Sequence, residues 1–315
     1  MKQLYKHRKI TEDYELTELV HDGKNSVYKA LRKADGQPVV VKFTSSRGKM
    51  KIAGSISQEY EIAYKLDHPN IIKYLDCRQD AEGFMLVMLD EGFIDFEKFY
   101  SSSKELTKIE NIEYFLQIAI QLTEAILYLH KKNIFFKDLH LSNIVIHPES
   151  RNIKLIDFGL ASQFIEKKDP SLTEYLAGTL AYISPEQTGR MNREIDYRTD
   201  FYSLGVCFYY LLVGKMPFMA KDPLGWVHCH IAQLPTVPSK INPALPKVFD
   251  QILMKLLEKN PDHRYQSALG LLHDLKVIEN QWEKHKSIQD FVIATQDISF
   301  LFQIAKYVIG AYKSK

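Results

Sequence analysis

Three side chains near the middle of the chain have the types and the spacing that phosphate chemistry requires. Phe136-Lys-Asp-Leu-His-Leu-Ser-Asn143 places Asp138 and Asn143 in one short segment that a strand-like stretch follows. If this segment curls, the carboxylate can accept the proton of an attacking hydroxyl while the amide holds a metal ion. Lys154-Leu-Ile-Asp157-Phe-Gly159 adds a second carboxylate at the end of an apolar strand. Such a carboxylate suits a Mg²⁺ ion that bridges phosphate oxygens.

Two further motifs follow along the chain. Gly178-Thr-Leu-Ala-Tyr-Ile-Ser-Pro-Glu186 ends in a carboxylate, and Asp200 heads an apolar stretch that is typical of a buried helix. Together with the first two motifs, they resemble a Ser/Thr protein kinase over nearly all of residues 12–275. In that family the glutamate pairs with a late arginine, for which Arg264 is the candidate, and the aspartate supports the backbone of the catalytic loop.

The resemblance implies an enzyme that uses ATP and Mg²⁺ to phosphorylate Ser or Thr of protein substrates. Asp138 would be the catalytic base, and Asn143 and Asp157 would hold the metal. Gly178-Thr179 resembles the segment of Ser/Thr kinases and not that of tyrosine kinases. The full segment up to Ser-Pro-Glu receives protein substrates in the family, which disfavours a small-molecule phosphotransferase with the same fold.

The first half of the chain should supply a lysine and a glutamate. Val40-Val-Lys42 resembles the strand lysine that grips the α- and β-phosphates. Glu59 resembles the helix glutamate that orients this lysine, and Glu61 is its rival. Two residues along a helix rotate a side chain by about 200°. We therefore expect Glu59 to face Lys42 and Glu61 to point away.

The other nucleotide contacts are expected from two segments. Met88 ends a strand-like run and would lie against the adenine, whose polar edge backbone groups near Leu89–Glu91 would hydrogen-bond. The phosphate loop Val20-His-Asp-Gly23-Lys-Asn-Ser-Val27 has fewer glycines than the family pattern. An asparagine stands where the last glycine is expected, and because Asn tolerates left-handed backbone, the loop is still expected to cover ATP, with weaker or slower binding. The expected nucleotide-binding residues are Gly23, Asn25, Val27, Val40, Lys42, Met88 and Glu91.

His140 departs from the family pattern, which places a lysine at this position beside the base. A histidine could donate one hydrogen bond to the transferring phosphate, and it is fully cationic only at lower pH. Alternatively, it fills space while the strand lysine and Mg²⁺ carry the charge. Lys137 keeps the positive charge that receives a phosphate in the family, and the candidate phosphorylation sites are Ser162, Ser171, Thr173 and Tyr175.

The elements that must position these residues change in character along the chain. Short β-branched runs predict strands before residue 92, together with one helix. Apolar residues at helical spacing predict mostly helices after it. The fold class is therefore α+β, a bilobal protein kinase fold with a small β-rich N-lobe that has one helix and a larger helical C-lobe. We expect an N-terminal extension over residues 1–11, the N-lobe over 12–92, the C-lobe over 93–276 and a helical, apolar extension over 277–315. The predicted strands are 27–30, 39–43, 71–75 and 84–89, and the predicted helices are 57–66, 109–130, 199–213, 248–258 and 267–282.

The composition is that of a globular protein of 315 residues, with 45% hydrophobic and 25% charged residues. A net charge of +2 does not call for a nucleic-acid partner or an anionic membrane. The three cysteines are scattered and read as buried thiols of a reducing compartment. His228-Cys-His230 is not expected to bind metal, because side chains two apart on a helix diverge. With neither a signal peptide nor a stretch apolar enough to span a bilayer, we expect a cytoplasmic protein; delivery into a host cell stays compatible with the sequence.

Some segments are more particular than a generic kinase. Tyr182-Ile-Ser-Pro-Glu-Gln-Thr-Gly-Arg-Met-Asn-Arg193 and Asp290-Phe-Val-Ile-Ala-Thr-Gln-Asp-Ile-Ser299 are similar to the N-terminal kinase module of bacterial hybrids. In these hybrids a kinase precedes an AAA-type ATPase and a sensor histidine kinase. The apolar tail 298–312 could dock on the kinase, contact a partner or a second copy, or anchor to a membrane surface, and we weight the three in that order. The rival to an active enzyme is a pseudokinase that serves as a nucleotide- or protein-binding scaffold, which the poor phosphate loop and His140 would favour.

Overall fold

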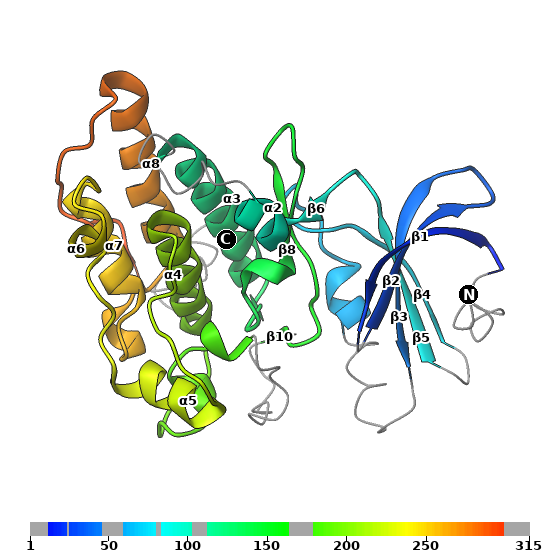
Figure 1. Cartoon of the computed structure of the whole chain (residues 1–315), viewed down its shortest axis with the longest axis horizontal. Helices are drawn as coiled ribbons and strands as arrows, with labels where there is room; N and C mark the ends of the chain where they lie inside the picture. The colour runs from blue at the N-terminus through cyan, green and yellow to red at the C-terminus, as the bar shows by residue number, and fades with distance from the viewer. Residues whose placement is uncertain are drawn as a thin grey trace, which may run out of the picture. The chain divides into compact units, whose positions relative to one another are not determined.

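The structure is a computed structural model that describes residues 12–23, 25–45, 59–79, 83–102, 112–163 and 179–298. The chain forms two compact units. The first, the β-rich unit, contains the residues up to Asp95 together with Val145–Ala161, and the second, the helical unit, contains Phe96–Ile144 and the residues from Ser162 onward. Strands dominate the first unit and helices the second (Figure 1). The α+β class predicted from the sequence is thus confirmed.

A five-stranded antiparallel sheet forms the frame of the β-rich unit, with its strands in the order β1-β2-β3-β5-β4 (Figure 1). Its central strand reads Pro-Val-Val-Val-Lys-Phe-Thr-Ser, a run of β-branched residues that favours a pleated, half-buried surface. A smaller sheet has the order β6-β8-β9. The strands are β1 Tyr14–Asp22, β2 Asn25–Arg32, β3 Pro38–Ser45, β4 Tyr74–Gln79, β5 Gly83–Leu89, β6 Ile94–Asp95, β8 Ile144–Ile146 and β9 Ile153–Leu155.

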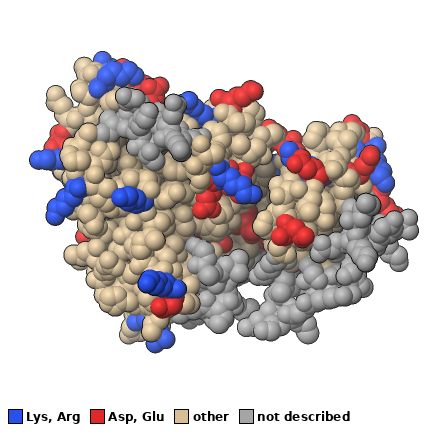
Figure 2. All heavy atoms as spheres, in the orientation of Figure 1, with Lys and Arg blue, Asp and Glu red and all other residues tan. Residues whose placement is uncertain are grey.

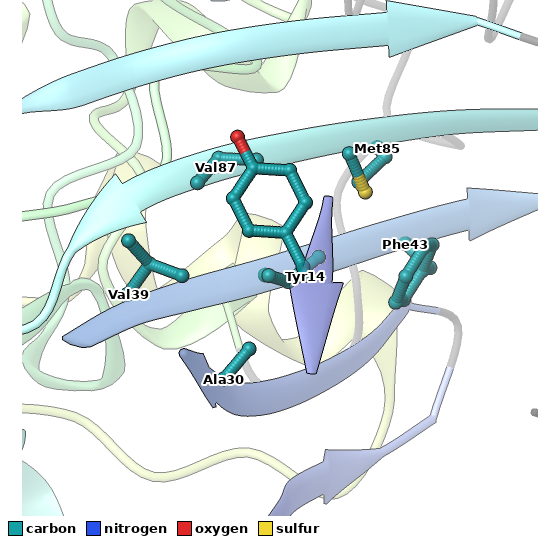
Figure 3. Packing of buried hydrophobic residues seen from close by; sticks show 7 residues of the cluster. Tyr14, Ala30, Val39, Phe43, Met85 and Val87 are labelled. Atoms are coloured by element: carbon teal, nitrogen blue, oxygen red, sulfur yellow. The ribbon is translucent and has the colours of Figure 1, made fainter. Parts of the chain in front are cut away.

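The two faces of the large sheet carry different side chains, because successive residues of a strand point to opposite faces. One face is an apolar core, and its side chains from neighbouring strands point toward one another in Figure 3. The opposite face carries Lys42, which is paired in register with Val27 on β2 and with Leu86 on β5. The sheet therefore buries one face and presents the other for chemistry. The core cluster consists of Tyr14, Ala30, Val39, Val41, Phe43, Met85 and Val87.

Long helices build the helical unit. The longest, α3, packs along α8 and also contacts α4. The helix ends are set by local chemistry: the Asp222 side chain caps α5, Ser267 caps α8, and Gly214 ends α4 in the left-handed region at φ 70°. The helices are α2 Phe96–Ser102, α3 Ile112–Lys131, α4 Arg198–Val213, α5 Pro223–Ala232, α6 Pro238–Ile241, α7 Lys247–Leu256 and α8 Ala268–His285, and the strands are β7 Ile134–Phe135 and β10 Ser162–Gln163.

One helix in the described part of the chain, α3, is long and apolar enough to cross a membrane by length and composition alone. The sequence prediction that no stretch reaches this length is therefore wrong by this criterion. Two thirds of the apolar window, 67%, is buried inside the protein. A core helix of a globular domain passes the same test.

The surface charges are mixed, as the small net charge suggests, and two of the three cysteines are buried, as expected. Basic and acidic side chains are mixed over the face that Figure 2 shows. All three cysteines are free: Cys207 and Cys229 are buried and Cys77 is half-buried. In the described ranges, no group of three or more His, Cys, Asp or Glu side chains gathers to hold a metal ion.

Most predicted elements lie within one to three residues of the observed ones. The exception is the strand predicted at 71–75, since β4 begins only at Tyr74. Ile71 instead forms an isolated parallel bridge with Leu155, so its partner is a residue far away in the sequence. Of the helix predicted at 57–66, residues 59–63 are helical, while 57 and 58 lie outside the described residues.

Candidate active site

Lys42 and Glu59 form a buried ion pair in the β-rich unit. The Lys42 Nζ lies 3.3 Å from both carboxylate oxygens of Glu59, whose side chain is 2% exposed. The Tyr74 hydroxyl donates to Glu59 Oε1 at 2.7 Å. Glu61, the rival, is exposed to solvent. The structure thus pairs the lysine with Glu59.

Charge and burial act against each other in this pair. Burial would lower the pKa of Lys42, but the carboxylates of Asp157 and Glu59 more than offset it and raise this pKa above its ordinary value. Burial and the nearby Asp157 carboxylate raise the pKa of Glu59 above its ordinary value, although Lys42 and the Tyr74 hydroxyl act to lower it. Since two donors bind this carboxylate, we assign it the ionised form. Lys42 is therefore a fixed cation.

Asp157 lies on the same cation. Its Oδ2 is 2.9 Å from the Lys42 Nζ, and its Oδ1 accepts from the Gly159 amide at 3.3 Å. The backbone of Asp157 is left-handed, with φ 63°, which costs an L-residue on the order of 1 kcal/mol or more and is typical of functional sites. A Cβ at Gly159 would lie only 3.2 Å from Asp157 Oδ1, so glycine leaves room for this carboxylate. The side chain is 36% exposed.

Several expected nucleotide contacts share one sheet face. Directly paired residues of antiparallel strands point to the same side. Val27 pairs with Lys42, which follows Val40 by two residues on β3, and Val40 pairs with Met88. Val27, Val40, Lys42 and Met88 therefore lie on the face opposite the apolar core.

In the segment after β5, some backbone and side-chain polar groups form hydrogen bonds or ion pairs with other residues of the β-rich unit. The Leu89 and Asp90 amides donate to the carbonyls of Lys73 and Pro38. The Glu91 carboxylate accepts from Lys154 at 2.6 Å. Within the described ranges the Glu91 amide donates to no backbone carbonyl.

The phosphate loop is a tight hairpin between β1 and β2. The Gly23 amide donates to the Asn25 carbonyl at 3.2 Å, and the Ser26 hydroxyl donates to Asp22 Oδ1 at 3.1 Å. The Asn25 side chain accepts from the Thr44 hydroxyl at 2.9 Å. These polar groups thus brace the turn itself, and Lys24 lies outside the described residues.

In the helical unit, Asp138 and Asn143 lie together, as the sequence predicted. A short 3-10 helix, Leu141–Asn143, curls the segment between them. The Asn143 Nδ2 donates to the Asp138 carbonyl at 2.9 Å and to Asp138 Oδ2 at 3.1 Å. The other carboxylate oxygen, Oδ1, is buried and has no hydrogen-bond partner in the described part of the chain. Buried polar atoms are nearly always hydrogen-bonded, so this oxygen is suited to a donor from a substrate.

His140 lies beside the same carboxylate. Its Nε2 is 3.7 Å from Asp138 Oδ2, beyond a direct hydrogen bond. Its ring centroid is 5.9 Å from that of Tyr182. His140 therefore adjoins the proposed base and packs on an aromatic ring.

Asp200 holds the backbone just before Asp138, as expected. Its two oxygens accept from the Phe136 amide at 3.0 Å and the Lys137 amide at 2.8 Å. The His130 Nε2 lies 2.8 Å from Asp200 Oδ2 and completes the support. No sequence pattern indicated that His130 would support Asp200 or that Tyr74 would bind Glu59.

Glu186 and Arg264 form a fully buried bidentate ion pair, which confirms the predicted partner. The Arg264 Nη1 and Nη2 donate to the two carboxylate oxygens at 2.6 and 2.8 Å. Burial would raise the pKa of Glu186, but the hydrogen bonds and charge of Arg264 outweigh it and lower this pKa. The Thr199 hydroxyl donates to the same carboxylate at 3.0 Å.

The two histidines of His228-Cys-His230 diverge on α5, as expected. His228 is exposed. His230 is buried: its Nε2 lies 2.8 Å from the Leu180 carbonyl and its Nδ1 lies 3.0 Å from the Tyr202 hydroxyl. Burial lowers the pKa of His230 to about 4. With both ring nitrogens engaged, this side chain has no free position for a metal.

The candidate phosphate-handling residues are only partly described. Lys137 is buried, with 6% exposure, and so is Ser162. Neither side chain is presented to solvent, as a phosphate receiver and a phosphorylation site would need. Ser171, Thr173 and Tyr175 lie outside the described residues.

Comparison with known proteins assigns the family. The protein kinase domain model matches residues 14–275. A probable serine/threonine-protein kinase of Clostridium perfringens is 30% identical over 273 residues, 84% of this chain and 38% of that protein. A serine/threonine-protein kinase of Myxococcus xanthus is 26% identical over 294 residues, 88% of this chain and 52% of that protein. A hybrid signal transduction histidine kinase of Dictyostelium discoideum is 43% identical over 115 residues, 36% of this chain and 3% of that protein.

The chain thus spans only 38% to 52% of the length of the two bacterial relatives. The match to the hybrid histidine kinase covers part of the chain, so the resemblance to a hybrid module rests on that segment. The kinase-domain match covers nearly all of the described residues. The chain therefore belongs to the protein kinase family, as a Hanks-type Ser/Thr kinase domain.

Proposed function

We propose that this chain transfers the γ-phosphoryl group of ATP to a Ser or Thr hydroxyl of a protein substrate. The observation that carries the proposal is the state of Asp138. One of its carboxylate oxygens is held by Asn143, while the other is buried without a hydrogen-bond partner among the described residues. A substrate hydroxyl would supply the missing donor and would thereby be oriented for attack.

Asp138 accepts the proton of the attacking hydroxyl as its oxygen bonds to the γ-phosphorus and the bond from this phosphorus to the bridging oxygen breaks, which releases ADP. The carboxylate is prevented from turning by the Asn143 amide, and the backbone before it is held by Asp200. Phosphoryl transfer asks little covalent chemistry of a protein, so positioning of this kind is a main contribution.

Asn143 and Asp157 are the residues that would hold Mg²⁺. The side-chain nitrogen of Asn143 donates to Asp138. The side-chain oxygen of Asn143 would then be the metal ligand, since Mg²⁺ prefers oxygen ligands. Asp157 offers a half-exposed carboxylate. Two protein ligands are a suitable number, because Mg²⁺ keeps waters and substrate phosphates as its other ligands. When bound, the ion would neutralise charge on the phosphate oxygens.

Lys42, oriented by Glu59, would bind the α- and β-phosphates of ATP. The adenine would lie on the sheet face that carries Val27, Val40 and Met88 and would accept a hydrogen bond from the Glu91 amide. Gly23 and Asn25 would cover the phosphates through the backbone of the hairpin. Because the Asn25 side chain accepts a hydrogen bond from Thr44, we expect weaker nucleotide binding than a glycine-rich loop gives.

His140 would act next to the base. From 3.7 Å it is placed to share a proton or a water molecule with Asp138, or to donate to the transferred phosphate. Its proximity to Asp138 supports a role in the reaction, and the Tyr182 ring beside it supports the alternative of simple packing.

The setting of the module is also proposed. We retain the boundaries 12–92 for the N-lobe, 93–276 for the C-lobe and 277–315 for a C-terminal extension. The partial match to a hybrid histidine kinase supports a module of a larger signalling protein. We propose a bacterial, cytoplasmic location, no nucleic-acid or membrane partner, and docking of the apolar tail on the kinase or on a partner or second copy, although residues after 298 lie outside the described part.

One assay tests the proposed function. Radiolabelled ATP with Mg²⁺ and a generic basic protein is incubated with the wild type and with Asp138→Ala, and the labelled amino acids are identified. We expect label on Ser and Thr with the wild type and a loss of about a hundredfold or more with the variant. Equal label in the two samples would refute the enzymatic function, and label on Tyr alone would refute the substrate class.

A further inference from the structure

Gln187 is a buried amide side chain that joins two segments of the helical unit. It is 1% exposed and lies in a short 3-10 helix, Glu186–Thr188. Its Nε2 donates to the Lys137 carbonyl at 2.8 Å, and its Oε1 accepts from the Ser184 amide at 2.9 Å. Both ends of one amide are thus used, one on each segment.

The first of these segments needs support. Lys137 has a left-handed backbone, with φ 65°, which is unfavourable for an L-residue with a side chain. Its amide donates to Asp200 Oδ1 at 2.8 Å, and its carbonyl accepts from Gln187. Since Lys137 directly precedes Asp138, the orientation of its peptide group sets where the carboxylate points. Asp200 fixes one side of this residue and Gln187 fixes the other.

The second segment is anchored by the buried network around Glu186. The Ser184 hydroxyl lies 3.1 Å from Gln187 Oε1 and also contacts the Thr199 hydroxyl. Thr199 in turn donates to Glu186, the partner of Arg264. Gln187 therefore ties the peptide before Asp138 to the segment that contains the buried Glu186–Arg264 ion pair.

We propose that Gln187 is a positioning residue for the phosphoryl transfer: it holds the Lys137–Asp138 peptide in a fixed position relative to the segment around Ser184. The inference rests on the proposed function, in which Asp138 is the base and the segment before Glu186 receives the protein substrate. The hydrogen bonds of Gln187 go to Ser184 and to the Lys137 carbonyl, so it acts on Asp138 through the backbone. Its loss should slow the chemical step and leave ATP binding in place.

Gln187→Met tests the inference, because methionine has nearly the same shape and neither donor nor acceptor. Gln266→Met is the matched control: this glutamine also donates to backbone carbonyls, those of Pro261 and Arg264, and accepts from Arg198. Both variants should lose thermal stability. At a temperature well below the unfolding midpoints of both variants, we expect kcat of Gln187→Met to fall roughly tenfold, with the KM for ATP unchanged. A tenfold fall corresponds to a rise of about 1.4 kcal/mol in the activation free energy. The control should keep kcat within about twofold of the wild type.

Amide hydrogen exchange gives a readout that does not need activity. In Gln187→Met, peptides that cover 136–139 and 184 should exchange at least about tenfold faster than in the wild type, and in Gln266→Met they should not. Gln187→Glu keeps the acceptor for Ser184 and loses the donor, so only 136–139 should lose protection. Unchanged exchange, or equal kcat losses in both methionine variants, overturns the inference. If the wild type and Asp138→Ala transfer equal label, the proposed function fails, while exchange still decides whether Gln187 holds the loop.

Discussion

Replacing Arg264 with alanine would leave the carboxylate of Glu186 buried without its cation. Both side chains are at most 1% exposed, and the pair is bidentate. Arg264 also donates to the Glu258, Lys259 and Arg198 carbonyls. Removal of one partner of a buried pair costs about 3–5 kcal/mol. For a unit of this size that corresponds to a fall in Tm of about 10 °C.

The loss should depend on pH in a defined direction. In the wild type the pKa of Glu186 is lowered from the ordinary value of 4.5, so the ion pair contributes in full above that value and is lost only as the pH falls below it. Without Arg264, burial raises the pKa of Glu186, and only hydrogen bonds from Thr199 and from the backbone oppose this rise. In the variant, the Glu186 carboxylate therefore binds a proton as the pH falls, and its unpaired buried charge is neutralised. The difference in unfolding free energy between wild type and variant should therefore shrink by about 1 kcal/mol or more between pH 7 and pH 5.

Tryptophan fluorescence can follow this unfolding selectively. Trp226 and Trp282, the two tryptophans of the chain, both lie in the helical unit, as the ion pair does. Urea unfolding at pH 5, 6, 7 and 8 gives the free energies. Arg193→Ala is the matched control, since Arg193 also pairs with a carboxylate, that of Asp262, but in the exposed state. A loss in Arg264→Ala no larger than in this control, or one that does not change with pH, would refute the reasoning.

Three further predictions concern single residues. Glu59→Gln should lower kcat/KM for ATP about tenfold or more, because it removes the charge that holds the lysine, whereas Glu61→Gln should keep it within twofold; equal effects in a steady-state ATP titration would contradict the assignment. His140→Lys should keep or raise turnover at pH 7, because lysine supplies the cation that the family places at this position, and a hundredfold drop would show that the histidine has its own role. Because the pKa of His230 is lowered to about 4, the unfolded state binds more protons between pH 4 and 6.5, so this residue should reduce stability as the pH falls through that window. In His230→Phe the pH dependence of urea unfolding over the window should flatten by about 2–3 kcal/mol, and an unchanged slope would mean that another group titrates.

Much of the fold is predictable because its signals are local. The run of valines before Lys42 specifies a strand whatever lies beside it, and the apolar periodicity of residues 112–131 specifies a helix. The strand predicted at 71–75 is wrong in its first residues because Ile71 forms a bridge with Leu155, in which the Ile72 amide donates to the Leu155 carbonyl and the Leu155 amide donates to the Asn70 carbonyl. Partners that far apart in the sequence leave no local pattern.

The same distinction holds for the site. Asp138 and Asn143 meet within one short loop, so their spacing allowed the contact, and the motifs that follow made it a prediction. Lys42 and Glu59 were predicted from the resemblance to the family, and the helix period indicated only that Glu61 would point away if Glu59 faced the lysine. Apart from Asp200, the residues that support them were not predicted, because a buried Tyr, His or Gln is indistinguishable from a core residue until its distant partner is known. Tyr74, His130 and Gln187 are of this kind.

The central claim is that Asp138 is the base of a phosphoryl transfer. The most direct test is the single-turnover rate of transfer from ATP to a basic protein, compared between the wild type and Asp138→Asn, with ATP binding measured in parallel. Asp222→Asn is the control, because Asn caps α5 as well as Asp does. We predict a fall of about a hundredfold or more in Asp138→Asn, with ATP binding kept and the control unchanged. A rate within about twofold of the wild type would contradict the claim.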